Sequence, residues 1–521
     1  MIVAPLYRRL NKMNCPGIAG PILWSTTLMR YHARSFEQFA RTGLTCRLAF
    51  LTGICVPSDF DSDDLSQVML SVRTSREAAF AALEEFRNSG NWLSDVLDRL
   101  YRTASLPPRE RGLATELACG VMRRMTTLDA ILRKLVARPL DQVEPPLLTI
   151  LRLGVYQIAL LDGVPPHASV HETVELTKRL GRMRWSGFVN GVLRGATRLI
   201  TSESDSSPGA RGVPVAEGRF RRLTADVFAD PQHDPAHYFA DAFSFPLWLG
   251  ERWLKLIPVA ELYRWGAWFN SPGRLVVRVN QLKTTTAALT AEFENAGVKA
   301  TGIEGFEAIA PEGISQVERL PHFDDGWFAV QDLSAMHAAR RLAPKPGQRV
   351  WDVCAAPGGK TCHLAELMEN SGQIIATDVR PERLRLVDEN RLRLGADIIQ
   401  TQLIGEDGSG LPAGPFDGIL VDVPCSNTGV LGKRPEARWR ITEGGITELN
   451  RIQERLLKMA LERLAPGGRL VYSTCSIEPE ENGNVVKRVI AGHADVKFAE
   501  EQLFLPGQPS DGGYQALLIR S

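Results

Sequence analysis

Apolar residues follow a helical period over the first strongly patterned region of the chain, from Ser75 to about Arg198. Ala79, Leu83 and Phe86 illustrate the spacing, which places them on one face of a helix. Pro-Pro pairs interrupt this region three times, as is typical of connections between the helices of a bundle. The pattern predicts an all-α domain over residues 71–200.

The pattern changes twice after this region. Residues 201–218 are rich in Ser, Gly and Pro and are interpreted as an inter-domain linker. Residues 219–345 combine an apolar strand at Leu275–Asn280 with helical stretches at Trp248–Trp268 and Thr284–Ala296. This mixture predicts a small α+β domain.

Short apolar strands alternate with amphipathic helices over residues 346–521. Strands are predicted at Arg349–Val353, Gln373–Asp378, Phe416–Val423 and Arg469–Ser473. A helix at Ile446–Leu464 has Leu449, Ile452 and Leu456 on one face. Such alternation predicts a parallel, doubly wound α/β sheet with helices on both faces. The chain as a whole is therefore expected to be multidomain.

Residues 1–70 contain neither a clean amphipathic helix nor the compact apolar core of a signal peptide. We interpret them as a disordered N-terminal extension. Met69, just before the first periodic helix, is a candidate start of the protein. Mass spectrometry of the native N-terminus tests this hypothesis, which peptides from residues 1–68 would contradict.

The composition fits a globular protein of several domains, since 44% of the 521 residues are hydrophobic and 23% are charged. There is no apolar run of about 18 residues, so no membrane span is predicted. The eight cysteines are scattered without a Cys-x-x-Cys pair. This argues against a disulfide framework or a metal site and favours reduced thiols in the cytoplasm.

Charge is informative in its distribution rather than in its sum. The chain has a net charge of +1, but Arg76–Arg198 holds 18 basic against 13 acidic residues. Within it, Lys178–Arg198 holds six basic residues and no acidic one. Such a stretch suits contacts with nucleic-acid phosphates, although an ordinary solvated basic face has the same composition.

A loop of small residues follows the first predicted strand of the sheet, at Cys354–Lys360, and a helix begins after it. In open α/β sheets, ligands bind beyond the carboxyl ends of the strands, and a helix N-terminus can receive a carboxylate or phosphate. A Walker A motif would need Gly in place of Cys354, and G-x-G-x-x-G is absent. The loop therefore indicates a different cofactor, or an ordinary tight turn.

Two aspartates are candidates for contacts with the same ligand. Asp378 ends the next strand, about twenty residues after the glycine loop, where an acid suits ribose hydroxyls. It suits the start of a helix at Pro381 equally well. Asp407 follows a further weak strand and is either a nucleobase contact or a turn aspartate.

Two later strands run into cysteine motifs, Asp422-Val423-Pro424-Cys425 and Thr474-Cys475-Ser476. A lone cysteine is most often part of the core, but two at the sheet edge that carries the glycine loop indicate chemistry. A thiolate that adds to C6 of cytosine makes C5 able to take a methyl group from a sulfonium donor, after which a second group must remove the C5 proton. The Asp422 carboxyl is placed to bind the N3/N4 edge of the base.

These motifs resemble those of the Sun/Fmu family of RNA 5-methylcytosine methyltransferases, over roughly residues 75–521. The resemblance rests on Cys354–Thr361, Asp422–Ser426 and Ser473–Ser476, and it extends to the bacterial members that modify 16S ribosomal RNA. Phe188–Arg194 is similar to the end of the NusB-like domain of that subfamily, and Asp511–Tyr514 to the family's closing strand.

The resemblance implies a NusB-like RNA-binding domain at 71–200, an α/β RNA-binding subdomain at 219–345 and a Rossmann-like class I methyltransferase domain at 346–521. It implies that Cys475 is the nucleophile and that Cys425 assists product release. DNA cytosine methyltransferases attack with the Pro-Cys cysteine, so the second cysteine favours RNA. No metal is implied. S-adenosylmethionine and the target base would be bound by Cys354, Ala355, Ala356, Pro357, Gly358, Gly359, Lys360, Asp378, Asp407 and Asp422.

The resemblance also implies 16S rRNA as the partner, free or within a small-subunit assembly intermediate, and we expect a cytoplasmic monomer without a membrane contact. Asn427 stands where the family often has Gly or Ala, which puts the shape of that loop in doubt. After the Cys425 motif, a group of arginines is interpreted as contacts to displaced RNA backbone or as a solvated loop: Arg434, Arg438 and Arg440.

Two other classes of protein compete with a methyltransferase. A catalytically idle RNA-binding factor would keep the fold, but the intact Cys425, Cys475 and Asp422 argue against it. A nucleotide-binding oxidoreductase or NTPase is disfavoured because both nucleotide-binding fingerprints fail.

Overall fold

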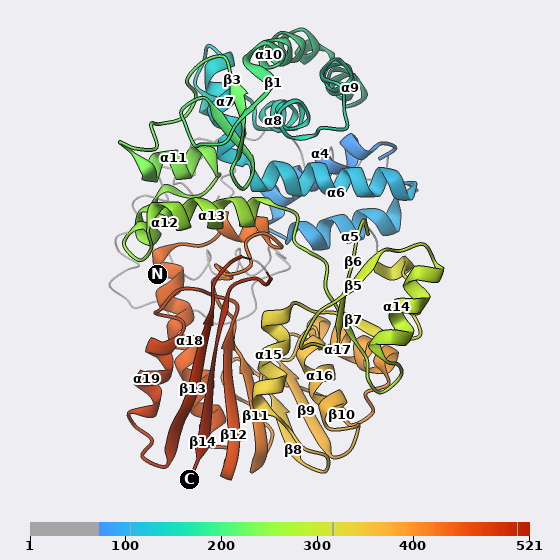
Figure 1. Cartoon of the computed structure of the whole chain (residues 1–521), viewed down its shortest axis with the longest axis vertical. Helices are drawn as coiled ribbons and strands as arrows, with labels where there is room; N and C mark the ends of the chain where they lie inside the picture. Colours follow the sequence, from blue (N-terminus) through green and yellow to red (C-terminus); the bar gives the residue numbers. More distant parts are fainter. Residues whose placement is uncertain (1–71, 105, 315–316, 508) are drawn as a thin grey trace, which may run out of the picture. The chain divides into compact units, whose positions relative to one another are not determined.

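The computed structural model describes residues 72–104, 106–314, 317–507 and 509–521 (Figure 1). The extension predicted over residues 1–70 and the candidate start at Met69 lie outside these ranges.

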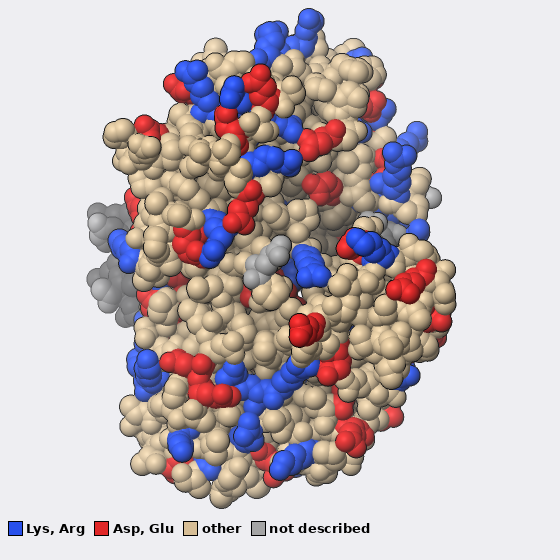
Figure 2. Space-filling view, viewed as in Figure 1, with Lys and Arg blue, Asp and Glu red and all other residues tan. Residues whose placement is uncertain are grey.

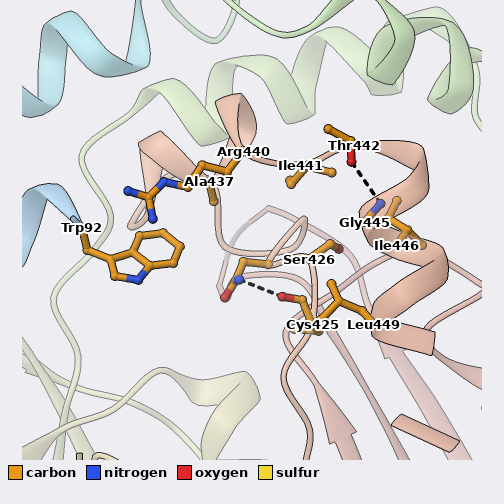
Figure 3. Close-up of a pocket in the computed structure, with 11 residues that line it drawn as sticks. Trp92, Cys425, Ser426, Ala437, Arg440, Ile441, Thr442, Gly445, Ile446 and Leu449 are labelled. Atoms are coloured by element: carbon orange, nitrogen blue, oxygen red, sulfur yellow. Dashed lines mark hydrogen bonds between the residues drawn. The ribbon is translucent and has the colours of Figure 1, made fainter. Parts of the chain in front are cut away.

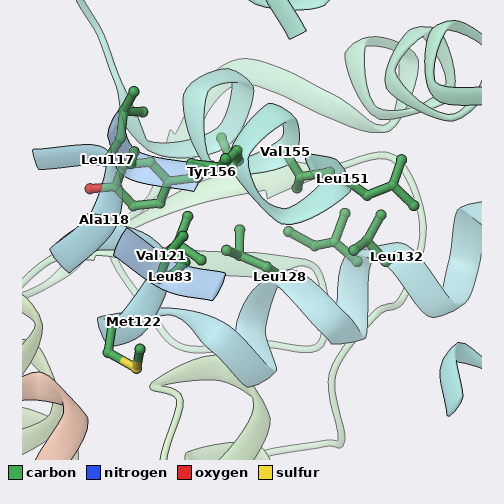
Figure 4. Close-up of a cluster of buried hydrophobic side chains, with 14 of the residues drawn as sticks. Leu83, Leu117, Ala118, Val121, Met122, Leu128, Leu132, Leu151, Val155 and Tyr156 are labelled. Atoms are coloured by element: carbon green, nitrogen blue, oxygen red, sulfur yellow. The ribbon is translucent and has the colours of Figure 1, made fainter. Parts of the chain in front are cut away.

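Helices alone make up residues 75–199. They are α4 (Ser75–Ser89), α5 (Leu93–Thr103), α6 (Pro108–Arg123), α7 (Met125–Leu135), α8 (Pro145–Leu160), α9 (Pro166–Arg179) and α10 (Ser186–Leu199), with the short 3₁₀ turns η1 (Leu140–Gln142) and η2 (Met183–Trp185). Each Pro-Pro pair begins a helix, because proline lacks the N–H that the first turn leaves unbonded anyway. The helices enclose a core to which α4, α6, α7 and α8 contribute Leu83, Leu117, Leu128 and Leu151 (Figure 4).

The interpretation of residues 201–218 as a linker is wrong. They belong to a three-stranded antiparallel sheet of order β1-β3-β2, with β1 at Ile200–Asp205, β2 at Gly212–Ala216 and β3 at Arg219–Leu223. Val213, Phe220 and Leu223 are buried in the same core as the helices. The Ser, Gly and Pro residues include the turn between β1 and β2, which is why composition alone suggested a flexible segment.

Three further helices extend the helical core rather than join the next sheet: α11 (Pro235–Ala242), α12 (Leu247–Leu254) and α13 (Val259–Asn270). Their aromatic rings contact one another, as in the pair Trp253 of α12 and Trp265 of α13 with ring centroids 5.6 Å apart. The one or two helices predicted at Trp248–Trp268 are two, and Pro258 directly precedes the second one.

A second small sheet has the order β5-β6-β4-β7 and is antiparallel. Its strands are β4 (Val277–Val279), β5 (Ala300–Gly302), β6 (Ala308–Pro311) and β7 (Phe328–Val330). Helix α14 (Thr286–Asn295) covers it with Leu289 and Phe293, and η3 (Val317–Arg319) precedes β7. Residues 219–345 are therefore divided among several cores. Those up to about residue 271 belong to the helical core, most of the following ones to the small sheet, and residues 333–342 also pack on the large sheet.

The largest sheet has seven strands in the order β10-β9-β8-β11-β12-β14-β13. They are β8 (Arg349–Asp352), β9 (Gln373–Asp378), β10 (Ile399–Leu403), β11 (Phe416–Asp422), β12 (Leu464–Thr474), β13 (Val496–Phe504) and β14 (Gly513–Arg520). The first five in spatial order are parallel, but β14 runs antiparallel to both of its neighbours, β12 and β13, so the predicted parallel sheet is mixed at that edge. The connection between β13 and β14 is short, which suits an antiparallel pair and not a parallel one.

Helices cover both faces of this sheet, which confirms the doubly wound α/β class. One face packs against α15 (Leu333–Leu342), α16 (Gly359–Leu367) and α17 (Pro381–Leu394), and the other against α18 (Glu443–Leu461) and α19 (Gly483–Ile490). The buried stripe of α18 includes Gln453 and Leu457 together with Ala460, whereas Leu449, Ile452 and Leu456, which were predicted on the buried face, are half-buried. The polar Gln453 lies in this stripe because it forms hydrogen bonds with residues of the site described below.

Candidate active site

The parallel strands β11 and β12 bring the two cysteine motifs together at their carboxyl ends. Asp422 is paired with Ser473 in the register, so the loops that follow lie side by side. As a result, Cys425 Sγ and Cys475 Sγ are 3.0 Å apart, and both are free thiols. The sequence predicted a common sheet edge, and the structure places the two sulfur atoms in direct contact.

The two thiols have different surroundings. Cys425 is 9% exposed, and its pKa is raised well above the ordinary value by its hydrogen bond with Cys475, by burial and by the nearby Glu481. Cys475 is more exposed, and its thiol donates to Asn427 Oδ1 at 3.2 Å. Cys425 is therefore held as a thiol beside a more accessible partner.

Asn427 shapes the loop between the cysteines. Its φ is +62°, in the left-handed region that Asn tolerates better than most residues, and its Nδ2 donates to Cys425 O at 2.9 Å. The departure seen in the sequence at this position thus brings an amide that contacts both cysteines.

Lys360 and Asp422 form an ion pair beside the thiols, with Lys360 Nζ donating to Asp422 Oδ2 at 2.8 Å. Burial alone would lower the pKa of Lys360, but the charge and hydrogen bond of Asp422, together with the proximity of Cys475, raise it. A fixed positive charge and a carboxylate are thereby held at the same edge as Cys475.

Glu481 connects the two cysteine loops, a role that was not predicted from the sequence. Its Oε1 accepts from Ser426 N at 2.9 Å and from Gln453 Nε2 at 3.0 Å. Its Oε2 accepts from the hydroxyls of Ser426 and Ser476. Burial raises the pKa of Glu481, against the lowering effect of these hydrogen bonds. The only sequence signal was an acidic run soon after Cys475, which pattern reading takes as exposed.

The glycine loop leaves room for a ligand. Gly358 has a φ of +100°, and a Cβ there would meet Val387 Cα at 3.2 Å, so a larger side chain is excluded. No atom lies within 4 Å of the Cβ position at Gly359, the first residue of α16, and no side chain caps this helix. The free N–H groups at that end suit an anionic group such as a carboxylate.

Asp352 lies beneath this loop, 1% exposed, and accepts from Thr361 Oγ1 at 2.7 Å. Its second oxygen, Oδ1, has no partner among the described residues. Burial raises the pKa of Asp352 to about 7, against the hydrogen bond from Thr361. An unbonded buried oxygen beside an open helix end fits a site for a polar, zwitterionic donor such as S-adenosylmethionine.

The two aspartates predicted to contact the donor are both engaged in local hydrogen bonds. Asp378 is 3% exposed and accepts from Arg380 N at 3.1 Å, as a residue before a helix does. Asp407 is exposed and accepts from the backbone N and the hydroxyl of Ser409, which lowers its pKa. Their roles toward ribose and nucleobase stay predictions.

The cysteine loop continues into η4 (Pro435–Trp439), where the interpretation of Arg438 as an RNA contact or a solvated residue is wrong. Its side chain is fully buried, and its guanidinium donates to five oxygen atoms, which compensates for the burial. The acceptors are Arg123 O, Ser244 O, Phe269 O, Leu431 O and Asn270 Oδ1. Arg440 donates to Asn91 O at 2.7 Å, whereas Arg434 is exposed.

The basic stretch of the helical domain is mostly exposed but partly neutralised. Lys178, Arg179 and Arg184 pair with Glu175, Glu77 and Glu144. Arg194 and Arg198 have no acidic partner among the described residues. Basic and acidic side chains are likewise interspersed on the face shown in Figure 2. Within the described ranges, no group of His, Cys, Asp or Glu is arranged as a metal site, and none of the helices has the length and apolar character that crossing a bilayer requires.

Comparison with known proteins gives matches over most of the chain. The profile of the 16S rRNA methyltransferase RsmB/F family matches residues 339–516, and that of the NusB family matches residues 73–198. The probable ribosomal RNA small subunit methyltransferase B of Synechocystis sp. is 34% identical over 430 residues, which cover 81% of this chain and 90% of that protein. The ribosomal RNA small subunit methyltransferase B of Escherichia coli O127:H6 is 32% identical over 465 residues, which cover 87% of this chain and 100% of that protein.

One solved structure is similar over much of the chain. The crystal structure of PH0851 superposes with a TM-score of 0.65 and covers 88% of this chain and 99% of that one. At 23% sequence identity, this likeness shows the fold alone.

Proposed function

Since the chain belongs to the RsmB/F family of 16S rRNA methyltransferases, we propose that it transfers a methyl group from S-adenosylmethionine to C5 of a cytosine in 16S rRNA. The observation that carries this proposal is the pair of free thiols 3.0 Å apart beside the Lys360–Asp422 ion pair. RNA C5 chemistry needs both a nucleophile and a group that helps its release, and two adjacent thiols of different exposure can divide these tasks.

Cys475 is the proposed nucleophile. Its thiolate adds to C6, so a S–C6 bond forms while the C5–C6 double-bond electrons become available at C5. Bound S-adenosylmethionine supplies an electrophilic methyl group, and its methyl–sulfur bond breaks as the bond to C5 forms. The C5 proton then goes to a base, the S–C6 bond breaks, and Cys475 leaves as a thiolate. Asp422 binds the N3/N4 edge of the base, and Lys360 holds Asp422 in place.

Cys425 is proposed to assist the release of Cys475. The largest cause of its raised pKa is its hydrogen bond with Cys475. Once the Cys475 sulfur is bonded to C6, that hydrogen bond is weakened, and Cys425 loses its proton more readily. It is then able to take the C5 proton, directly or through a water molecule.

The donor is proposed to bind against the loop Cys354–Lys360 with Asp378 and Asp407. The unbonded Asp352 Oδ1 and the open start of α16 support this assignment. The helical domain is proposed to hold the rRNA through its exposed basic residues. We further propose that the enzyme acts as a cytoplasmic monomer, on free 16S rRNA or on an assembly intermediate of the small subunit.

A denaturing gel of protein mixed with labelled small-subunit rRNA and S-adenosylmethionine tests the proposal with wild type, Cys425→Ala and Cys475→Ala. Cys425→Ala is expected to accumulate a covalent RNA–protein band that Cys475→Ala lacks. A band in Cys475→Ala alone would reverse the two roles. If no lane shows a band and the wild type transfers no methyl group, the chain is an RNA-binding factor or has another substrate.

A further inference from the structure

A cavity of about 190 Å³ lies beside Cys425 (Figure 3). Cys425, Ser426 and Asn427 form one wall, and residues between Ala437 in η4 and Leu449 in α18, including Arg440 and Thr442, form most of the rest. The remaining wall is Trp92, which belongs to the loop before α5 in the helical domain. The volume of the cavity is below the roughly 300–1,000 Å³ of pockets that enclose drug-sized ligands, and it suits a single planar ring system.

Trp92 is held in this position by the catalytic domain. The guanidinium of Arg440 lies 4.3 Å from the centroid of the Trp92 ring and donates to Asn91 O. Glu436 Oε1 accepts from Leu93 N at 3.1 Å, at the first turn of α5. Both residues belong to the segment that follows the Cys425 motif, so the position of Trp92 and the position of the catalytic loop depend on each other.

We propose that this cavity binds one nucleobase that flanks the target cytosine in the substrate RNA, with Trp92 as its aromatic wall. This inference rests on the proposed function and adds to it a specificity-determining contact from the helical domain. Aromatic side chains are the usual partners of unstacked bases in single-stranded RNA. The wall of the cavity is mostly aromatic and aliphatic, and Arg440 is its one charged residue.

The occupant is a flanking base rather than the methylated one, because the residues that line the cavity are not those that the methylated base has to contact. None of the lining residues comes from the loop Cys354–Lys360, and neither Cys475 nor Asp422 lines it. A base that receives the methyl group has to contact Cys475 and face the donor. A base in this cavity is instead one position away, on the Cys425 and Asn427 side of the thiol pair.

Arg434 provides a cation for the adjoining backbone. It is exposed, its guanidinium lies 5.2 Å from the centroid of the Trp92 ring, and it has no acidic partner among the described residues. A phosphate next to the bound base would therefore meet a free guanidinium. Arg440 cannot serve in the same way, because its guanidinium is already bonded to backbone carbonyls.

Photocrosslinking of the full-length protein tests the contact directly. 16S rRNA transcribed with 4-thiouridine in place of part of its uridine is irradiated in complex with the trapped Cys425→Ala variant and, separately, with wild type. Mass spectrometry is expected to find RNA-derived mass on the tryptic peptide 88–99, which contains Trp92. Crosslinks in both complexes that exclude this peptide overturn the inference.

Kinetics with the wild-type substrate give the second readout. Trp92→Ala is expected to raise the KM for RNA roughly tenfold, within the range measured for loss of one base–aromatic contact, with a smaller effect for Trp92→Phe. The KM for S-adenosylmethionine should not change. The control Tyr101→Leu removes an aromatic ring from α5 that contacts Arg111 and does not line the cavity.

The two proposals fail in different ways. If wild type methylates RNA and both Trp92 variants keep its KM, the flanking-base contact is wrong and the proposed function stands. If wild type transfers no methyl group, the proposed function is wrong, and the crosslink of wild type to peptide 88–99 still decides whether RNA contacts Trp92. An equal rise in KM for Tyr101→Leu would assign the effect to the stability of α5 and overturn the inference.

Discussion

At the scale of single residues, buried polar side chains rather than the cysteines set the geometry of the thiol pair. Glu481 binds the serine after each cysteine, and Asn427 contacts both cysteines. Gln453 lies in the buried stripe of α18 because it donates to Glu481 and to Pro424 O. In this buried network Gln453 Oε1 is the one oxygen without a partner among the described residues, and a network bonded to this extent favours one arrangement of the two loops.

Glu481→Gln is expected to lower kcat by roughly tenfold to a hundredfold, because a displacement of about 1 Å in a reacting group has effects of this size. Glutamine keeps the shape but replaces one acceptor oxygen with a donor, so the two serine hydroxyls lose their shared partner. The KM for S-adenosylmethionine should change little. Single-turnover methyl transfer measures the effect.

The matched control for this substitution is Glu480→Gln. Glu480 is the preceding residue, and its carboxylate pairs with Arg252 instead of the cysteine loops. It should keep the kcat of wild type. An equal loss in both variants, or no loss in Glu481→Gln, would show that the Glu481 network does not position the thiols.

Asp352 makes stability depend on pH in a direction opposite to that of a salt-bridged carboxylate. Burial raises its folded pKa to about 7 from 3.8, so between these values the folded protein binds this proton more tightly than the unfolded chain. Its contribution to the free energy of unfolding is present below the unfolded pKa and falls by up to about 1.4 kcal/mol per pH unit as pH rises toward 7.

Urea unfolding of wild type and Asp352→Asn at pH 5 and at pH 8 measures this contribution. Asparagine cannot ionise, so the variant is expected to lose less stability than wild type between the two pH values. Other titrating groups contribute equally to both proteins and cancel in the difference. The same pH dependence in both proteins would show that Asp352 is not protonated in the fold.

At the scale of elements, the sequence predicted best where burial is uniform. Strand β9 has the predicted bounds, Gln373–Asp378, because a central parallel strand is a continuous apolar run. The pattern failed for β1–β3, where alternating polar residues and a turn rich in Ser and Gly resemble a linker. It also failed for Arg438, because a pattern-based prediction places charged residues at the surface, and no pattern pointed to the buried Glu481.

The sequence motifs predicted the central residues of the candidate site more completely than the residues that hold them in place. Residues at strand ends are brought together by the topology of a parallel sheet, so Asp422, Cys425 and Cys475 were predictable as neighbours. Trp92 and Glu481 contact the site through loops whose course depends on tertiary packing. No spacing in the sequence connects Trp92 with Cys425, which is more than 300 residues away.

The side chain of Arg438 holds the segment η4 in place. Substitution of Arg438 should therefore destabilise the protein strongly. Arg438→Lys keeps a charge but cannot reach five acceptors with a single ammonium, so buried carbonyls lose their donors. We expect the free energy of unfolding to fall by about 3–5 kcal/mol, a loss of the size found when one partner of a buried polar pair is removed. Thermal unfolding measures it, with Arg455→Lys, an exposed residue of α18, as the control that should keep the Tm of wild type.

At the scale of the described chain, the helical domain and the cysteine loop share one hydrophobic core. Leu431, Ala437, Ile441, Ile446 and Ile477 are buried in the same cluster as the side chains of α4–α13. Arg252 and Trp253 of α12 also bind Glu478, three residues after Cys475. The NusB-like domain thus supports the cysteine loops of the candidate site, and it is also a candidate RNA-binding surface.

Because of this shared core, we expect that a substitution that destabilises the helical domain also destabilises residues 431–446 of the cysteine loop. Leu128→Ala removes a fully buried side chain of α7 and is expected to destabilise the helical core by about 2–5 kcal/mol. Hydrogen exchange should then accelerate in α6 and α8 and also in residues 431–446, because both sets of amides are protected by one cluster. As the control, Leu289→Ala in the separate core of the small sheet should accelerate exchange in α14 and leave α6 and α8 unchanged. Unchanged protection of residues 431–446 in Leu128→Ala would mean that the catalytic loop is stable without the helical domain, and that this domain contributes to catalysis only by binding RNA.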